Sequence, residues 1–286
     1  MVETSQLSLS RHNNNIVPRL GFRILAGLAL AGLALWGLRP STAQNDRALD
    51  LAAYEQTFSE DFDTLDVSAW GPDTRWISHT PYHGDFGDGV FANPVPGFPF
   101  TIANGVLRIE ARKDRDGKWH SGLLSSIDVK GNGFAQQYGY FEMRAKLPAG
   151  EGVWPAFWLL GRDRSATAAE VDVIEYYGHN PTAYESAIHV WDLKSPDKSR
   201  VAASRISVPF GSLSREFHNY GASIDEDMIR IYFDRREVWN VKTMPEHRQP
   251  MYLLVDLAVG GGWPIANMPN PSFMYVDYVR AWRRRE

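Results

Sequence analysis

Hydrophobic and polar residues alternate over short segments along most of this chain. Residues 106–111 and 139–147 show a period of two, and residues 251–259 are almost entirely apolar, as in a strand that is buried on both faces. After the first forty residues, no segment keeps a helical period for about twelve residues. Turn signals rich in Gly and Pro separate the segments. The pattern predicts an all-β sandwich or barrel, and without a repeat or a break in composition we expect one domain over residues 54–286.

One predicted strand, residues 169–175, carries three carboxylates among branched aliphatic residues. Alternation places Glu170 and Asp172 on one face but would turn Glu175 into the core, where an unpaired carboxylate is costly. A β-bulge near residues 173–174 would return Glu175 to the acidic face, and bulges often lie beside active sites. The spacing therefore predicts three acids on one face of a bulged strand.

Three neighbouring carboxyl groups titrate together, because each negative charge disfavours the next one. A retaining glycosidase uses such a group, with one ionised carboxylate that attacks the sugar and one protonated carboxyl that protonates the leaving oxygen. These two groups stand about 5–5.5 Å apart. On the strand alone, an edge strand that carries acids to prevent aggregation is an equal alternative.

The flanking sequence favours catalysis. WPAFWLL at residues 154–160, followed by E-x-D-x-x-E, resembles the family 16 glycoside hydrolases, the laminarinase and lichenase group. The six-residue motif is similar to the laminarinase form. The resemblance implies that Glu170 is the nucleophile, that Asp172 assists and that Glu175 is the acid/base. It also implies a β-jelly roll of two curved antiparallel sheets with a concave substrate cleft.

Aromatic residues and one histidine are candidates for substrate binding. Trp154 and Trp158 are four residues apart and can share one strand face, although both could equally be core residues. The resemblance implies that Trp154 lines the donor side, that Trp158 packs beneath the nucleophile and that Trp263 lies at the cleft edge. It also implies that His189 contacts the acid/base or the leaving-group sugar; a structural role is the alternative. Residues 71–100, rich in Gly, Pro and aromatics, are predicted to form a cleft-side loop.

No cofactor is expected for catalysis. In the family, the position of Asp277 and the carbonyl at Gly105 often hold a structural Ca²⁺ ion, which prefers oxygen ligands. Two features depart from the family pattern: Ala168 and Ala169 precede the first acid, and Asp256 replaces an Asn. These departures concern the choice of substrate more than the reaction.

The first residues resemble an export signal. Arginines precede an apolar run over residues 24–38, and a small-x-small pattern ends at Ala43. We interpret residues 1–43 as a signal peptide and residues 44–53 as a linker. An uncleaved inner-membrane anchor formed by residues 24–38 is the alternative, although the run is shorter than the ~20 residues of a comfortable span. Both interpretations predict an exported domain, periplasmic or secreted.

Charge and composition narrow the possible partners. The net charge is −4, and residues 1–43 hold several arginines but one acid, so the remainder is more acidic still. This argues against nucleic acid as a partner, and the lack of Cys excludes disulfides.

We predict a monomeric, retaining endo-β-glycanase that acts on a polysaccharide, either a β-1,3 or mixed β-1,3-1,4 glucan or a bacterial exopolysaccharide. A transglycosylase and a non-catalytic, lectin-like carbohydrate-binding jelly roll are the alternatives.

Overall fold

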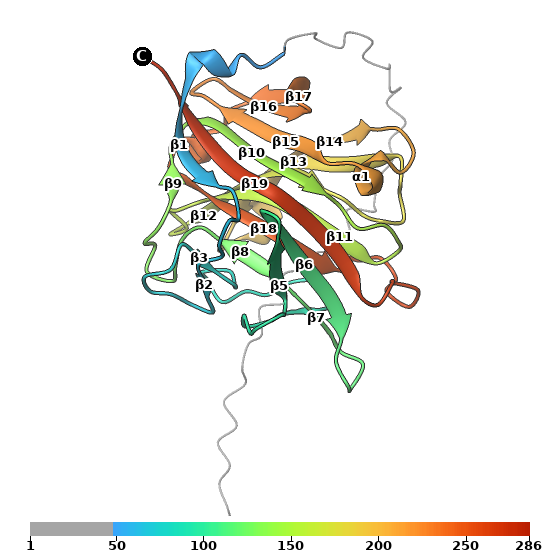
Figure 1. Ribbon diagram of the computed structural model, residues 1–286. Coiled ribbons are helices and arrows are strands. Elements are labelled where there is room, and N and C mark those ends of the chain that lie inside the picture. The colour runs from blue at the N-terminus through green and yellow to red at the C-terminus, as the bar shows by residue number, and fades with distance from the viewer. Residues whose placement is uncertain (1–47) are drawn as a thin grey trace, which may run out of the picture.

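A computed structural model describes residues 48–286 (Figure 1). The predicted signal peptide or anchor, residues 1–43, lies outside the described residues. Within the described range, no helix has both the length and the apolar character needed to cross a membrane.

Two sheets make up the described chain, which confirms the all-β prediction. Ten strands form the first sheet along the path β17 (Arg236–Lys242), β16 (Met228–Phe233), β15 (His218–Ile224), β10 (Gly139–Lys146), β19 (Ser272–Arg284), β6 (Val106–Lys113), β7 (Trp119–Ser121) and β4 (Val90–Phe91), with β1 (Tyr54–Glu60) paired to β19 and β5 (Phe100–Ala103) paired to β6. Nine strands form the second sheet along the path β14 (Arg200–Ser207), β13 (Ala183–Asp192), β12 (Thr167–Glu175), β11 (Val153–Gly161), β18 (Met251–Val259), β8 (Leu123–Ser125), β3 (Trp76–Ile77) and β2 (Val67–Ser68), with β9 (Ala135–Gln136) paired to β18. The helical turns are η1 (Leu51–Ala53), η2 (Pro196–Lys198), α1 (Ser212–Arg215) and η3 (Pro245–His247). The sheets are antiparallel except at the short pairs β2–β3 and β4–β7, which are parallel.

The main core lies between the two sheets, and β18 shows how the second sheet contributes to it. Leu253, Val255 and Leu257 point into this core, whereas Tyr252 and Leu254 join a second apolar cluster on the opposite face. All nine residues of β18 are buried, as its apolar sequence predicts. The face with the second cluster is turned away from the ten-stranded sheet, and we call it the site face.

The sequence of residues 119–129 favours one continuous strand, but the structure divides it. β7 belongs to the ten-stranded sheet and β8 to the nine-stranded sheet, so the chain changes sheets at Gly122. A Cβ atom at Gly122 would lie 2.6 Å from the ring of Phe100. The close packing of two sheets at this corner therefore breaks a run that is continuous by pattern.

Residues 48–53, predicted as the end of a linker, are attached to the ten-stranded sheet. The amide of Leu49 donates to the carbonyl of Arg235 at 2.9 Å. A small cluster covers the outer face of that sheet, with Leu49, Leu51 and Tyr54 packed on Tyr140, Tyr232 and Trp282. Because β1 follows directly and pairs with β19, the start of the described chain lies beside its C-terminus (Figure 1).

Candidate active site

The predicted bulge is present in β12. Cα pairing with β13 matches Asp172 with Ala187 and Glu175 with Glu185, so β12 uses one more residue than its partner. The extra residue lets both Val173 and Ile174 enter the main core. Because the two apolar side chains between the acids share one face, all three acids share the other.

Three rows of residues cross the site face, and each contains one of the acids. Across β13, β12, β11 and β18, they are Glu185, Glu175, Ala156 and Asp256; Ala187, Asp172, Trp158 and Leu254; and His189, Glu170, Leu160 and Tyr252. On the neighbouring strands the rows are two residues apart, which is the ordinary strand period. On β12 alone the rows are two and then three residues apart. The bulge takes up the extra residue, so the three acids of E-x-D-x-x-E fall in register with the evenly spaced residues of the neighbouring strands.

Glu170 bonds to Trp191, a residue that the sequence reasoning missed. The indole Nε1 of Trp191 donates to Oε1 of Glu170 at 3.1 Å. Burial, with the charge of Asp172 added, raises the pKa of Glu170 to about 8, whereas His189 and the Trp191 hydrogen bond act to lower it. Trp191 stands two residues after His189, so strand alternation could have placed both on the site face.

Asp172 lies between the two glutamates and is buried. Its Oδ2 atom is 3.3 Å from Nε2 of His189, whose ring stacks on Trp191. Burial raises the pKa of Asp172 well above its ordinary value, and the charges of Glu175 and Asp256 add to this effect. The Cα atom of His189 pairs with that of Glu170, at the end of the trio that is farthest from Glu175. The side chain of His189 therefore contacts the central acid and not the predicted acid/base.

Glu175 accepts two hydrogen bonds on the same oxygen. Nε1 of Trp154 donates to Oε1 at 3.1 Å, and the hydroxyl of Tyr177 donates to it at 3.2 Å. Burial raises the pKa of Glu175, while His189 and these two donors oppose the rise. Trp154, predicted on the donor side, is thus bonded to the predicted acid/base. Tyr177 was not singled out, although it follows Glu175 by two residues.

Trp158 occupies a different place from the predicted one. The resemblance placed it beneath Glu170, but Leu160 is the neighbour of Glu170 on β11. Trp158 is paired with Asp172, and its Nε1 donates to Oδ1 of Asp256 at 2.8 Å. The register between β11 and β12 decides this position, and a spacing within one strand does not reveal that register.

The segment 71–100 covers part of the site face, as its aromatic content predicts. The ring of Phe86 meets the rings of Trp154 and Trp158 edge-on, at 5.4 Å and 5.8 Å between centroids. The amide of Asp88 donates to the carbonyl of Val259 at 2.8 Å, which attaches the segment to β18. These contacts cover the two indoles beside the acids, and burial at this face raises the pKa values of all three acids.

Trp263 lies at the edge of the site face and is 45% exposed. Its ring centroid is 3.9 Å from that of His179, and Tyr177 stands beside both. A small hollow opens here, lined by Tyr177, His179, Asn180, Ala183, Tyr184, Glu185, Arg205 and Trp263. The exposed indole agrees with the predicted position at the cleft edge.

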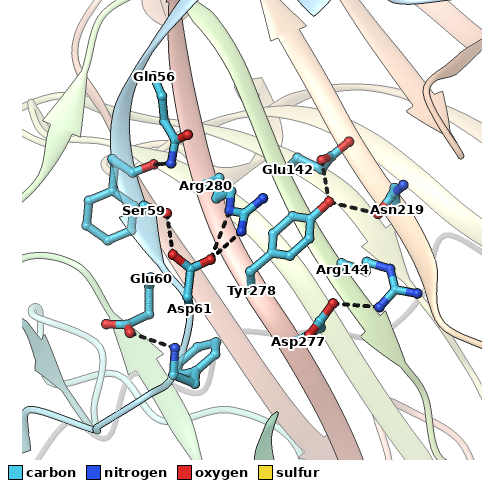
Figure 2. Close-up of polar contacts among 12 residues, drawn as sticks. Gln56, Ser59, Glu60, Asp61, Glu142, Arg144, Asn219, Asp277, Tyr278 and Arg280 are labelled. Carbon is cyan, nitrogen blue, oxygen red and sulfur yellow. Dashed lines mark hydrogen bonds and ion pairs between the residues drawn. The ribbon is translucent and has the colours of Figure 1, made fainter. Parts of the chain in front are cut away.

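The residues proposed to hold calcium have other contacts. Nη1 of Arg144 lies 2.5 Å from Oδ2 of Asp277 (Figure 2). Gly105 takes a left-handed conformation, with a φ angle of 70°, and faces the carbonyl of Asp61. A cation at Asp277 would compete with the guanidinium, which counts against binding through this carboxylate. The calcium ion stays a prediction.

Comparison with known proteins assigns the family. Residues 100–280 match the model for glycosyl hydrolases family 16, and the chain belongs to this family. It is 35% identical over 257 residues to the endo-1,3-1,4-beta-glycanase EglC of Rhizobium meliloti (strain 1021), which covers 82% of this chain and 53% of that protein. It is 33% identical over 258 residues to ExsH, an endo-1,3-1,4-beta-glycanase of the same organism, with the same coverage. The chain thus spans about half the length of these curated relatives.

A solved structure shows the same fold. The laminarinase catalytic domain of Thermotoga maritima MSB8 superposes with a TM-score of 0.63 at 25% sequence identity, and the match covers 82% of this chain and 99% of that domain. The two-sheet architecture is therefore that of a family 16 jelly roll, as the motif implied.

Proposed function

We propose that this chain is a retaining endo-β-glycanase that hydrolyses internal β-glycosidic bonds of a polysaccharide by double displacement. The observation that carries the proposal is the bulged strand β12, which aligns Glu170, Asp172 and Glu175 on a face lined with indoles. A strand that serves only to block aggregation would need neither the bulge nor a buried Asp172 between two partly buried glutamates.

The surroundings of the acids support distinct roles. Trp191 and His189 favour the ionised form of Glu170 against the burial that raises its pKa, and this ionised form is the one that attacks the anomeric carbon. Glu175 gives its proton to the leaving oxygen as that bond breaks. Once Glu170 is a neutral glycosyl ester, its charge no longer raises the proton affinity of its neighbours. Glu175 can then accept a proton from the water that cleaves the ester, which completes hydrolysis with retention.

The substrate class follows from the family and the aromatic rings. The EglC and ExsH proteins are both named for cleavage of 1,3-1,4-β-linked glycans. We propose a β-1,3 glucan, a mixed β-1,3-1,4 glucan or a bacterial exopolysaccharide with such linkages in its backbone. Trp263 offers an exposed ring on which a pyranose can stack.

Azide rescue tests the roles of the two glutamates. With an activated aryl β-glycoside, Glu170→Ala should be inactive until azide enters the vacated space, and the product should be the α-glycosyl azide. Glu175→Ala should yield the β-glycosyl azide, because the nucleophile still forms the intermediate and azide then replaces it. The opposite pair of products would exchange the two roles.

Product analysis on a panel of glucans and acidic exopolysaccharides separates the three activities. An endo-hydrolase releases oligosaccharides and new reducing ends in proportion to bonds broken. A transglycosylase produces longer chains with no net gain of reducing ends, and a lectin-like protein leaves the polymer intact.

Export is part of the same proposal, because a bacterial exopolysaccharide lies outside the cytoplasm. The order of arginines, an apolar run and small residues in residues 1–43 supports it. N-terminal sequencing of exported protein should find a start near Gln44, whereas a start at Met1 would favour the anchor. Sedimentation analysis of the same sample tests the predicted monomer.

A further inference from the structure

Asp256 is a buried carboxyl group that the proposed mechanism does not use. It stands in the middle of β18 and is 0% exposed. Its two oxygens accept hydrogen bonds from neutral donors, the indole of Trp158 at 2.8 Å and the amide of Ala258 at 3.0 Å. A buried carboxyl without a cationic partner is expensive, so its presence beside the acid trio calls for an explanation.

The register places Asp256 opposite Glu175. Ala156 is the Cα partner of Asp256 on one side and of Glu175 on the other. The two acids therefore lie two strand spacings apart, roughly 10 Å between Cα atoms. All three residues are on the site face, and Ala156, the residue between the two acids, has only a methyl side chain.

The electrostatic effects agree with this geometry. Burial and then the charge of Glu175 raise the pKa of Asp256 to about 8, against the two hydrogen bonds that it accepts. In return, the charge of Asp256 helps to raise the pKa of Asp172. The titratable groups that face Asp256 are these two acids on β12 and Tyr82 from the covering segment, whose pKa it also raises.

We propose that Asp256 is a positioning residue that fixes the indole of Trp158 in the floor of the site and that, once ionised, it favours the protonated forms of Asp172 and Glu175. The proposal rests on the proposed function, since it assigns a role in holding the proton that Glu175 must donate. The fixed indole lies in the same row as Asp172 and against the ring of Phe86, so it supports both the central acid and the segment that covers the site.

Titration of the free protein tests the charge effect without any substrate. The side-chain carboxyl carbons of Asp and Glu are labelled with ¹³C, the chemical shifts of Asp172 and Glu175 are followed against pH, and Asp256→Asn is compared with wild type. The amide oxygen of Asn can still accept the Trp158 hydrogen bond, so the shape is kept while the charge is lost. We expect both carboxyls to titrate at lower pH by roughly half a unit or more. Asp116→Asn, in an exposed turn, is the matched control and should change nothing.

A second variant keeps the test decisive if Asp256→Asn does not fold. Trp158→Phe removes the donor that stabilises ionised Asp256, so Asp256 holds its proton more firmly and the same two carboxyls should shift in the same direction. Combined with Asp256→Asn, Trp158→Phe should add no further shift, because both changes act through one interaction. Unmoved titrations in a folded variant would overturn the proposal.

Kinetics then separate the positioning role from the proposed function. In Asp256→Asn, the alkaline limb of kcat/KM should move to lower pH. In Asp256→Ala, KM should also rise about tenfold, as for one lost hydrogen bond, while KM in Asp256→Asn stays near wild type. Equal KM values in both variants would contradict the positioning role. If the wild-type chain cleaves no glycan, the proposed function fails, whereas the carbon titrations still decide the role of Asp256.

Discussion

At the scale of single residues, different hydrogen-bond donors surround each of three similar acids. Trp191 donates to Glu170, and Trp154 and Tyr177 donate to Glu175. Asp172 has His189 beside it. Since a donor favours the charged form of a carboxyl group and burial opposes it, these neighbours control the order in which the acids lose their protons.

Asp172 should affect turnover more than binding. Asp172→Asn keeps the shape of the side chain but removes a charge that raises the proton affinity of its neighbours. We expect kcat to fall about 10²-fold or more, in the range of acid–base contributions, with little change in KM. The apparent pKa of Glu175 should also fall. Steady-state kinetics across pH measure both effects, and a variant with wild-type kcat and pH profile would make Asp172 a bystander on the strand.

Trp191 should control the ionisation of Glu170. Trp191→Phe removes the indole N–H that stabilises the charged form, so the pKa of Glu170 rises and the acidic limb of kcat/KM moves to higher pH. One lost hydrogen bond to a charged group corresponds to roughly a tenfold loss in kcat/KM. Trp239→Phe, on the far edge of the other sheet, is the control. An unmoved acidic limb in Trp191→Phe would show that the indole only fills space.

At the scale of elements, two positions break the usual sequence rules for a strand or a turn, and at both of them a side chain has an additional role. The bulge in β12 breaks alternation to keep an acid on the site face. The β16–β17 turn is a second exception, because Asp234 and Arg235 have φ angles of 49° and 62°, values that favour glycine. Arg235 there donates to both oxygens of Glu142, at 3.0 Å and 2.9 Å.

Arg235→Gly should therefore destabilise the fold although it relieves the backbone. Glu142 is fully buried and also accepts from Tyr278 (Figure 2), and loss of its cation leaves a buried charge unpaired. We expect the free energy of unfolding to fall by about 2–3 kcal/mol, less than for a fully buried pair because Arg235 is partly exposed. Urea titration measures it. Asp73→Gly, which relieves a similar φ angle of 63°, should be neutral or stabilising; equal effects in both variants would contradict a role for the ion pair.

At the scale of the whole molecule, the acids on the site face weaken the fold. The pKa of Glu170 is about 8 in the folded protein against 4.5 in the unfolded chain. Between these values the folded state keeps a proton that the unfolded state has lost. The free energy of unfolding therefore decreases as pH rises from about 4.5 to 8. Asp256 acts in the same direction.

Glu170→Gln should remove this cost. We expect a gain of roughly 1–3 kcal/mol at pH 8, with little difference at pH 4.5, where wild-type Glu170 is protonated in the folded state and still half protonated in the unfolded state. Chemical unfolding at the two pH values measures the effect, and Glu55→Gln on an exposed part of β1 is the control. A gain of equal size at both pH values would mean that the amide packs better, not that a charge was removed.

The sequence by itself determined the fold class, the bulged strand and the placement of three acids on one face. It could do so because alternation and the cost of burying a charge act along one strand, within a few residues of Glu170. A similar local argument placed residues 71–100 beside the site, whereas the position of Trp263 at the cleft edge was implied by the family resemblance.

Only the tertiary structure decided which side chains meet across strands. The register between β11 and β12 put Trp158 beside Asp172 and on Asp256, and the register of β13 put His189 and Trp191 on the acids. Packing between the sheets divided the run after Trp119 and attached residues 48–53 to the first sheet. These outcomes depend on contacts between segments far apart in the chain, and a one-residue change of register would alter them without changing any local pattern.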